Sequence, residues 1–369
     1  MRLLLHVLFV LLWSSFAIAD DTMMNTSDMA STDAFTPIPK EFNLEDTSKS
    51  VIVNNMPRIR SQDSFNTCYG CSSATIVQKY ICDKHPDYIG KSCSNLPLDM
   101  EVSQMDLVSK TLTNRDGQSI ESPSNHVNIR IKDSDRKKTE GMFALLSAQA
   151  KFQFNSEACF PFDQLVEKYG NFSGTITDKF LKKMEIYYST KKTEADTDCT
   201  ECLTEIKEGL NADVNQEQFN LALKKNTFGE FLYSLVFNKP CAKKISMSEG
   251  PNVGLFPKNE QVRKSDLLGK LKEALGNPKE NRPVLVGNVC LYKAKSNNNC
   301  LTHSLVISGY KMMCTDKEKK YCKPAIKVHN CWGKDWQDKN NDGWVDAEKL
   351  LANVNGPMNP DDGALSWLY

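Results

Sequence analysis

The number of cysteines is the feature that most constrains how this chain can fold. Thirteen cysteines lie among its 369 residues, which is typical of a protein that folds in an oxidising compartment, where disulfides persist. Because thirteen is odd, at least one cysteine stays outside the disulfides of its own chain. A reactive thiol and a buried structural cysteine are both consistent with that count.

The first 19 residues predict export. Arg2 is followed by an almost wholly apolar run at residues 3–13, and residues 17–19 (Ala-Ile-Ala) have the small-x-small form of a cleavage site. The apolar run is shorter than the about 20 residues that a membrane-spanning helix needs. We therefore expect residues 1–19 to be a signal peptide. The mature protein is then expected to be secreted or periplasmic, with no membrane contact after signal removal.

The overall charge gives no sign of a nucleic-acid partner. Lys and Arg together number 46, as do Asp and Glu, so the formal net charge is zero, whereas nucleic-acid-binding domains usually carry a basic excess. Cys199 and Cys202 could form half of a zinc site, but no second pair has ligand-like spacing. We therefore expect no nucleic acid, no metal and no cofactor.

Helical periodicity dominates the first two thirds of the chain. From Cys68 onward, Ala74, Val77 and Ile81 fall on one helical face. Residues 163–262 differ in being rich in Lys and Glu. The helices predicted after residue 163 cover residues 176–189, 200–210, 215–237 and 264–276.

Short runs rich in β-forming residues follow, at residues 283–292, 303–313 and 325–332. Helices followed by strands favour an α+β fold over repeated βαβ units. Before the first helix, residues 20–37 are polar and show no apolar period. That segment predicts a flexible leader.

One cysteine and one histidine are candidates for nucleophilic chemistry. Cys68 lies at the predicted start of a helix, where backbone N–H groups and the helix dipole favour the nucleophilic thiolate. The chain has five histidines, of which His6 leaves with the signal peptide. His303 opens an apolar strand after a polar loop, so its ring can stand at the mouth of that strand. His329 lies beside Asn330 in the next strand.

Three motifs in sequence order resemble those of the papain-like cysteine proteases. Residues 61–74, SQDSFNTCYGCSSA, resemble the nucleophile motif, in which a glutamine precedes the catalytic cysteine by six residues. Residues 302–310, THSLVISGY, resemble the histidine strand of the family. Residues 330–333, NCWG, resemble its Asn-Ser-Trp-Gly motif. The chain is therefore identified as a divergent, secreted member of that family.

The resemblance implies a role for each matching residue. Cys68 would attack the scissile carbonyl, and His303 would accept the thiol proton and later protonate the leaving amine. Asn330 would orient the imidazole. The Gln62 side chain and the Cys68 backbone N–H would form the oxyanion hole. Trp332 would shield the hydrogen bond between histidine and asparagine from water.

The resemblance also implies an architecture and a substrate class. A helical N-terminal lobe would carry the nucleophile, and a β-sheet or barrel C-terminal lobe would carry the histidine and the asparagine. A polypeptide substrate would lie extended in the cleft between them. The peptidase domain would cover residues 38–369, with a helical insertion at about 163–262. Gly141 is a candidate substrate-binding residue, as a relic of the family's paired-glycine motif.

Two other functions fit parts of the sequence. A catalytically inactive papain-like binding protein would have the same fold, although Gln62, Cys68, His303 and Asn330 are all retained. Cys68 and Cys71 also form a C-x-x-C pair, the motif of thiol-disulfide oxidoreductases, and a disulfide between them could switch the enzyme off. That motif normally follows a hydrophobic strand, whereas residues 58–67 are polar.

The remaining cysteines are expected to form disulfides. The plausible pairs are Cys82 with Cys93, Cys290 with Cys300, Cys314 with Cys322, and Cys199 or Cys202 with Cys241. Residues 338–346 copy the first part of a calcium-binding loop, but its twelfth position is Lys349 and not the glutamate that a tight site needs. A turn is the favoured interpretation, because turns are also rich in Asp, Asn and Gly.

Overall fold

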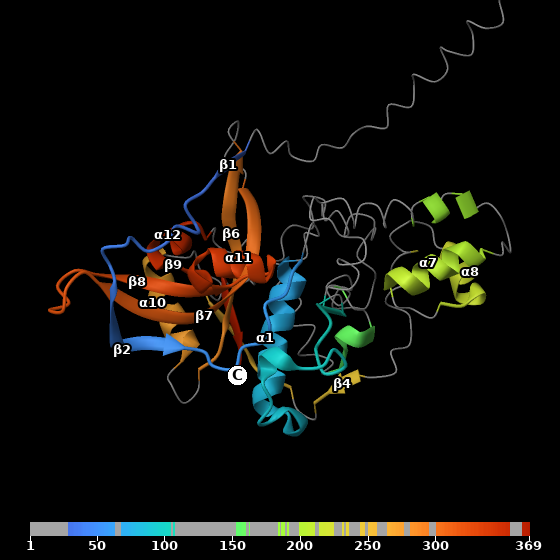
Figure 1. Ribbon diagram of the computed structural model, residues 1–369, viewed down its shortest axis with the longest axis horizontal. Coiled ribbons are helices and arrows are strands. Elements are labelled where there is room, and N and C mark those ends of the chain that lie inside the picture. The colour runs from blue at the N-terminus through green and yellow to red at the C-terminus, as the bar shows by residue number, and fades with distance from the viewer. Residues whose placement is uncertain are drawn as a thin grey trace, which may run out of the picture.

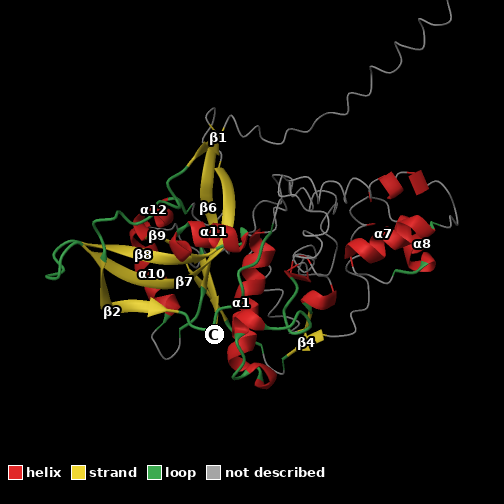
Figure 2. Cartoon of the chain, viewed as in Figure 1, coloured by secondary structure: helices red, strands yellow, loops and turns green. Residues whose placement is uncertain are grey.

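The computed structural model describes residues 29–62, 68–104, 106–107, 153–159, 162, 184, 186–188, 190–191, 199–210, 214–224, 231, 234–235, 244–247, 250–256, 264–276, 281–294, 300–354 and 364–369. They combine helices with a large antiparallel sheet (Figure 2). The prediction of an α+β fold is confirmed.

The main sheet has eight strands in the order β5-β10-β6-β7-β8-β9, with β1 paired to β6 and β2 paired to β7. Its strands are β1 (Met29–Ser31), β2 (Leu44–Ile52), β5 (Val253–Phe256), β6 (Val284–Ala294), β7 (Cys300–Cys314), β8 (Cys322–His329), β9 (Trp344–Asp346) and β10 (Leu365–Leu368). Strands β6, β7 and β8 confirm the three β-rich runs of the sequence. The long strand β7 pairs with β6, β8 and β2, so it is the centre of the sheet.

Helix α1 (Cys68–Lys84) packs against strands β6, β7 and β10. Its residues Ile76, Val77 and Ile81 form one apolar cluster with Leu285 and Val306 of the sheet. Buried residues lie on every side of the helix, which distinguishes α1 from an amphipathic surface helix. Figure 1 shows the main sheet on one side of α1 and helices α7 (Thr200–Leu210) and α8 (Gln216–Leu223) on the other. The helix is therefore a firmly packed support for the residue at its N-terminus.

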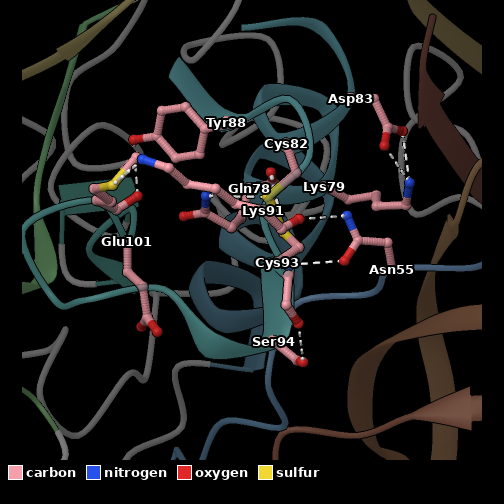
Figure 3. The surroundings of a disulfide bond; sticks show 12 residues. Asn55, Gln78, Lys79, Cys82, Asp83, Tyr88, Lys91, Cys93, Ser94 and Glu101 are labelled. Atoms are coloured by element: carbon pink, nitrogen blue, oxygen red, sulfur yellow. Dashed lines mark hydrogen bonds and ion pairs between the residues drawn. A yellow bond between two sulfur atoms is a disulfide. The ribbon is translucent and has the colours of Figure 1, made fainter. Parts of the chain in front are cut away.

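The far end of α1 is fastened to the segment that follows it by the predicted Cys82–Cys93 disulfide (Figure 3). Two amide side chains complete this junction. Gln78 Oε1 accepts a hydrogen bond from the backbone N–H of Val102 at 2.6 Å, and Asn55 Oδ1 accepts one from that of Cys93 at 2.7 Å. Two short 3₁₀ helices, η2 (Pro86–Tyr88) and η3 (Cys93–Asn95), lie in the same segment.

Three further helices lie between strands of the main sheet in sequence. They are α10 (Lys264–Leu275), α11 (Gly333–Lys339) and α12 (Ala347–Ala352). Leu267, Leu271 and Leu275 recur every four residues along α10, which brings them to one face. They are fully buried in one cluster with Val284 and Val286 of β6. Helix α10 confirms the helix predicted at residues 264–276.

A separate apolar cluster lies within the predicted insertion. Helix α7 (Thr200–Leu210) confirms the helix predicted at residues 200–210, and α8 (Gln216–Leu223) covers only the first part of the helix predicted at residues 215–237. Met184, Phe219 and Phe231 are fully buried in this cluster. The predicted boundary at residue 262 is wrong, because β5 pairs with β10 in the main sheet. In addition, β4 (Lys244–Ser246) pairs with β3 (Gln153–Asn155). Strands of three or four residues are too short to show a period in a Lys-rich sequence.

The predicted flexible leader is also partly wrong. Strand β1 pairs with β6, and the backbone N–H of Thr32 donates to the carbonyl of Leu291 at 2.8 Å. Ala34 is 1% exposed, and Phe35 packs against two tryptophans of the C-terminal part of the chain. Residues 29–37 are therefore part of the fold. Their polar composition did not predict this order, because it comes from pairing with a strand more than 250 residues away.

Residues 338–349 form a turn and a helix start. All three residues of η5 (Asn341–Gly343) have positive φ, between 51° and 81°, a conformation that Gly and Asn adopt most readily. Asp346 caps α12 by accepting hydrogen bonds from two backbone N–H groups at 2.9 and 3.2 Å, and Asp342 forms an ion pair with Lys327. These contacts support the turn over the calcium loop.

Several predictions fall on other parts of the chain. The signal peptide at residues 1–19 and the candidate substrate-binding residue Gly141 lie outside the described residues. Within the described part, no helix combines the length and the apolar character required to cross a bilayer.

Candidate functional site

Cys68 is the first residue of α1, and it is the one described cysteine that takes part in no disulfide. Its side chain is partly exposed. The sulfur accepts a hydrogen bond from the backbone N–H of Ser304 at 3.4 Å, and both this donor and the helix N-terminus favour the thiolate. Ser304 follows His303 in β7. The fold thus brings the thiol next to the histidine strand, 236 positions further along the chain.

His303 and Asn330 are joined by a hydrogen bond. His303 Nε2 lies 2.8 Å from Asn330 Oδ1, and the two residues are 4% and 0% exposed. The backbone N–H of Cys331 donates to the same Oδ1 at 2.8 Å, so this atom acts as an acceptor toward both neighbours. Nε2 of His303 must therefore carry a hydrogen. In a neutral ring, Nδ1 then keeps its lone pair and can accept a proton.

Trp332 covers this histidine, and two further aromatic rings pack against Trp332. The ring centroids of His303 and Trp332 are 4.9 Å apart at an interplanar angle of 35°. Trp336 and Phe35 contact Trp332 edge-on, at 5.6 and 5.5 Å. Such an environment excludes water and strengthens the hydrogen bond to Asn330. Burial lowers the pKa of His303 to about 4, although the hydrogen bond to Asn330 opposes that shift.

Gln62 lies beside the Asn330 motif. Its backbone N–H donates to the carbonyl of Cys331 at 2.7 Å, Ser61 forms an isolated β-bridge with Trp332, and Gln62 is 6% exposed. The segment at residues 63–67, between Gln62 and α1, lies outside the described residues. The fold therefore gathers Gln62, His303, Asn330 and Trp332 around one end of strands β7 and β8, with Cys68 reaching them through Ser304.

A buried ionic cluster holds the backbone that leads to Gln62. Arg60 is 2% exposed and lies 3.2 Å from Glu157 and 3.6 Å from Glu101. Arg58 Nε pairs with Glu101 at 2.8 Å. The carbonyl of Arg60 accepts the backbone N–H of Gly333 at 3.0 Å, which links the cluster to the Asn330 motif. Sequence analysis missed this cluster, since single charged residues far apart in a chain give no signal of pairing.

The C-x-x-C interpretation of Cys68 is contradicted. Cys71 forms a disulfide with Cys331 and is 0% exposed. Cys71 is therefore not available as a resolving thiol for Cys68, and the hypothetical Cys68–Cys71 switch loses its second sulfur. Both cysteines stand inside motifs that resemble those of the family, at positions where the family has other residues. Two such departures, one in each motif, were the available signal of this pairing.

Most of the other described disulfides agree with the pairs predicted from the sequence. Pairs Cys82–Cys93, Cys290–Cys300 and Cys314–Cys322 are confirmed. The prediction that Cys199 or Cys202 bonds to Cys241 is wrong, because Cys199 and Cys202 bond to each other at the start of α7. Sequence spacing cannot separate such alternatives, since connectivity depends on which loops the fold brings together.

Two buried histidines give stability a defined pH dependence. Burial lowers the pKa of both His303 and His329 to about 4. At His329, a hydrogen bond to the backbone of Arg58 opposes the shift, and the charges of Lys327 and Arg60 reinforce it. The unfolded chain has ordinary histidines of pKa about 6.5. Between pH 6.5 and 4 the unfolded state therefore binds more protons, and the free energy of unfolding falls as pH is lowered.

Replacing His329 by glutamine should flatten this dependence. Each histidine contributes about 3 kcal/mol of the loss between pH 7 and 4, from a shift of about two and a half pKa units. The difference in unfolding free energy between wild type and His329→Gln should therefore change by about that amount over this range, in favour of the variant at low pH. Denaturant unfolding at a series of pH values measures it. A constant difference from pH 7 to 4 would contradict the burial of a neutral His329.

Comparisons with known proteins give only distant matches. No protein-family model and no curated protein matches this chain. Among solved structures, a recombinant stem bromelain precursor is 11% identical, with 93% of this chain and 78% of that chain covered and a TM-score of 0.38. A digestive procathepsin L 3 of Tenebrio molitor larval midgut is 11% identical, covering 91% and 77%, with a TM-score of 0.37. A proCathepsin B S9 from Trypanosoma congolense is also 11% identical, covering 94% and 87%, with a TM-score of 0.36.

Proposed function

We propose that this chain is a secreted papain-like cysteine peptidase that hydrolyses polypeptides through Cys68, His303 and Asn330. The hydrogen bond from His303 to Asn330 is the observation that carries the proposal. It leaves Nδ1 of a neutral imidazole as the proton acceptor. The Cys68 sulfur lies close by, because it accepts a hydrogen bond from the backbone N–H of Ser304, the residue after His303 in β7. A structural histidine would need no such fixed tautomer next to a partly exposed thiol.

The reaction begins with proton transfer from the Cys68 thiol to His303 Nδ1. The thiolate attacks the scissile carbonyl carbon, and the oxyanion that forms is stabilised by the Cys68 backbone N–H and the Gln62 side chain. The imidazolium of His303 then protonates the leaving amine as the C–N bond breaks, which gives an acyl-thioester. Water attacks the thioester and gives a proton to His303. The C–S bond breaks, the carboxylic acid leaves, and the proton returns to the thiolate.

In the proposed reaction, burial of His303 matters before proton transfer and ion pairing matters after it. A low pKa keeps His303 neutral at physiological pH, which is the form that accepts the thiol proton. Once the proton has moved, the thiolate and the imidazolium stabilise each other by charge attraction, which offsets the burial that otherwise disfavours the cation. The aromatic cover of Trp332 and Phe35 keeps that attraction in a poorly screened environment.

Secretion and the domain limits belong to the same proposal. The confirmed disulfides Cys82–Cys93, Cys290–Cys300 and Cys314–Cys322 account for six cysteines. Such bonds persist outside the reducing cytosol, which supports secretion. We propose removal of residues 1–19, a peptidase domain that includes residues 29–37, and a helical insertion that ends before β5. Polypeptides are the proposed partners.

Labelling with a thiol-reactive epoxide tests the proposal directly. The native protein should gain one covalent label, located on Cys68 by peptide mass spectrometry, and should cleave members of a peptide library. Cys68→Ala should do neither. A wild-type protein that folds but stays unlabelled and inactive would favour the papain-like binding protein without catalysis.

A further inference from the structure

The Cys71–Cys331 disulfide joins the two segments that carry the proposed catalytic residues. Cys71 is three positions after Cys68, within the first turn of α1, and Cys331 directly follows Asn330. The bond spans 260 positions of sequence, and its cysteines are 0% and 1% exposed. It is therefore a buried covalent link between the nucleophile's helix and the loop of the orienting amide.

Cys331 contacts three other parts of the proposed site: helix α1, the Asn330 side chain and the backbone at Gln62. Its sulfur bonds to Cys71 on the helix of the nucleophile. Its backbone N–H donates to Asn330 Oδ1 at 2.8 Å, and its carbonyl accepts the backbone N–H of Gln62 at 2.7 Å. A displacement of Cys331 would thus move the orienting amide and the oxyanion segment together, relative to Cys68.

A noncovalent contact supports the same junction. Ser72 Oγ donates to the carbonyl of Ser304 at 3.0 Å, next to the hydrogen bond between Ser304 N–H and Cys68. These two contacts align α1 with β7. Ser72 Oγ also lies 3.9 Å from the Cys331 sulfur, a much weaker link to the end of β8 than a covalent bond. Within the described residues, the disulfide is the covalent connection that fixes α1 to that end of β8.

We propose that the Cys71–Cys331 disulfide is a positioning bond for catalysis. It holds Asn330, and through it the His303 imidazole, in the geometry that accepts a proton from Cys68. A displacement of about 1 Å of reacting groups can cost about 10²-fold in rate, without any loss of substrate contacts. The bond thus acts on kcat more than on KM. This inference rests on the proposed peptidase function.

The double variant Cys71→Ala/Cys331→Ser tests the inference. Serine at position 331 is close to cysteine in size, and the backbone N–H and carbonyl that hold Asn330 and Gln62 are retained, so the covalent link is removed without loss of these two hydrogen bonds. We expect kcat to fall about 10- to 100-fold with KM within about threefold of wild type. The rate of epoxide labelling at Cys68 should fall in parallel. The matched control is Cys314→Ala/Cys322→Ala, which removes a disulfide at the remote hairpin between β7 and β8 and should keep wild-type kcat.

Three outcomes would overturn the inference: wild-type kcat in the double variant, a loss expressed in KM alone, or an equal loss of kcat in the control. If the double variant does not fold, partial reduction of the native wild-type protein gives the answer. Activity should then fall in proportion to reduced Cys71 and Cys331, quantified by mass spectrometry, and constant activity would overturn the inference. Failure of the proposed function is distinguishable, because wild-type protein would then carry no label and cleave no peptide.

Discussion

His303→Ala is expected to lower kcat/KM for peptide cleavage by about 10⁴-fold. The variant loses both the acceptor of the thiol proton and the donor to the leaving amine, and removal of a catalytic base commonly costs as much as removal of the whole catalytic unit. His303 also forms the 2.8 Å hydrogen bond to Asn330, so the alanine variant removes one of the two hydrogen bonds that Asn330 Oδ1 accepts. Steady-state kinetics with one peptide selected from the library measure the effect.

His85→Ala is the matched control for this variant. His85 precedes η2, where its Nδ1 accepts a hydrogen bond from the backbone N–H of Asp87 at 3.2 Å, and it contacts none of the proposed catalytic residues that the structure describes. We expect its kcat/KM to stay within about twofold of wild type. The assignment of His303 as base would be wrong if His303→Ala kept its fold and more than a tenth of wild-type kcat/KM.

The elements nearest the site were predictable because their signals are local. The β-rich runs of β7 and β8 each lie within one short segment, and the small residues that follow Cys68 begin a helix in sequence and in structure. Sequence spacing could not show that His303, Asn330 and Trp332 meet. That prediction depended on the order and content of three motifs, and the described geometry brings these side chains together.

The features that escaped prediction all depend on partners far away in sequence. Strand β1 gains its order from β6, and β5 gains it from β10, although neither shows a strong period of its own. The pairing of Cys71 with Cys331 depends on the fold, which brings together two cysteines that are 260 positions apart in the sequence. The one partner that the sequence suggested for Cys71 was Cys68, as an alternative to a free catalytic thiol, because a three-residue spacing is visible and a 260-residue spacing is not.

The pairing of buried charges was also not predictable from the sequence, and its expected effect on the free energy of unfolding is large. Arg58, Arg60, Glu101 and Glu157 balance to zero net charge. Arg60, Glu101 and Glu157 are at most 2% exposed. Removing one charge leaves its partner buried and uncompensated, which costs about 3–5 kcal/mol. Glu157→Gln should therefore lower the free energy of unfolding by about that amount at neutral pH, as measured by denaturant unfolding.

Glutamine is the informative substitution because it keeps the acceptor role of Glu157. The carboxylate accepts the backbone N–H groups of Phe162 at 2.9 Å and Gln104 at 3.3 Å, and an amide oxygen can still accept from one of them. The loss then combines the charge left on Arg60 with the loss of one of these two hydrogen bonds. Asp338→Asn is the matched control: its ion pair with Lys334 is exposed, and such pairs are worth at most about 1 kcal/mol. Equal losses in the two variants would contradict a buried, paired Arg60, and with it the ionic support of the backbone that holds Gly333 beside the proposed triad.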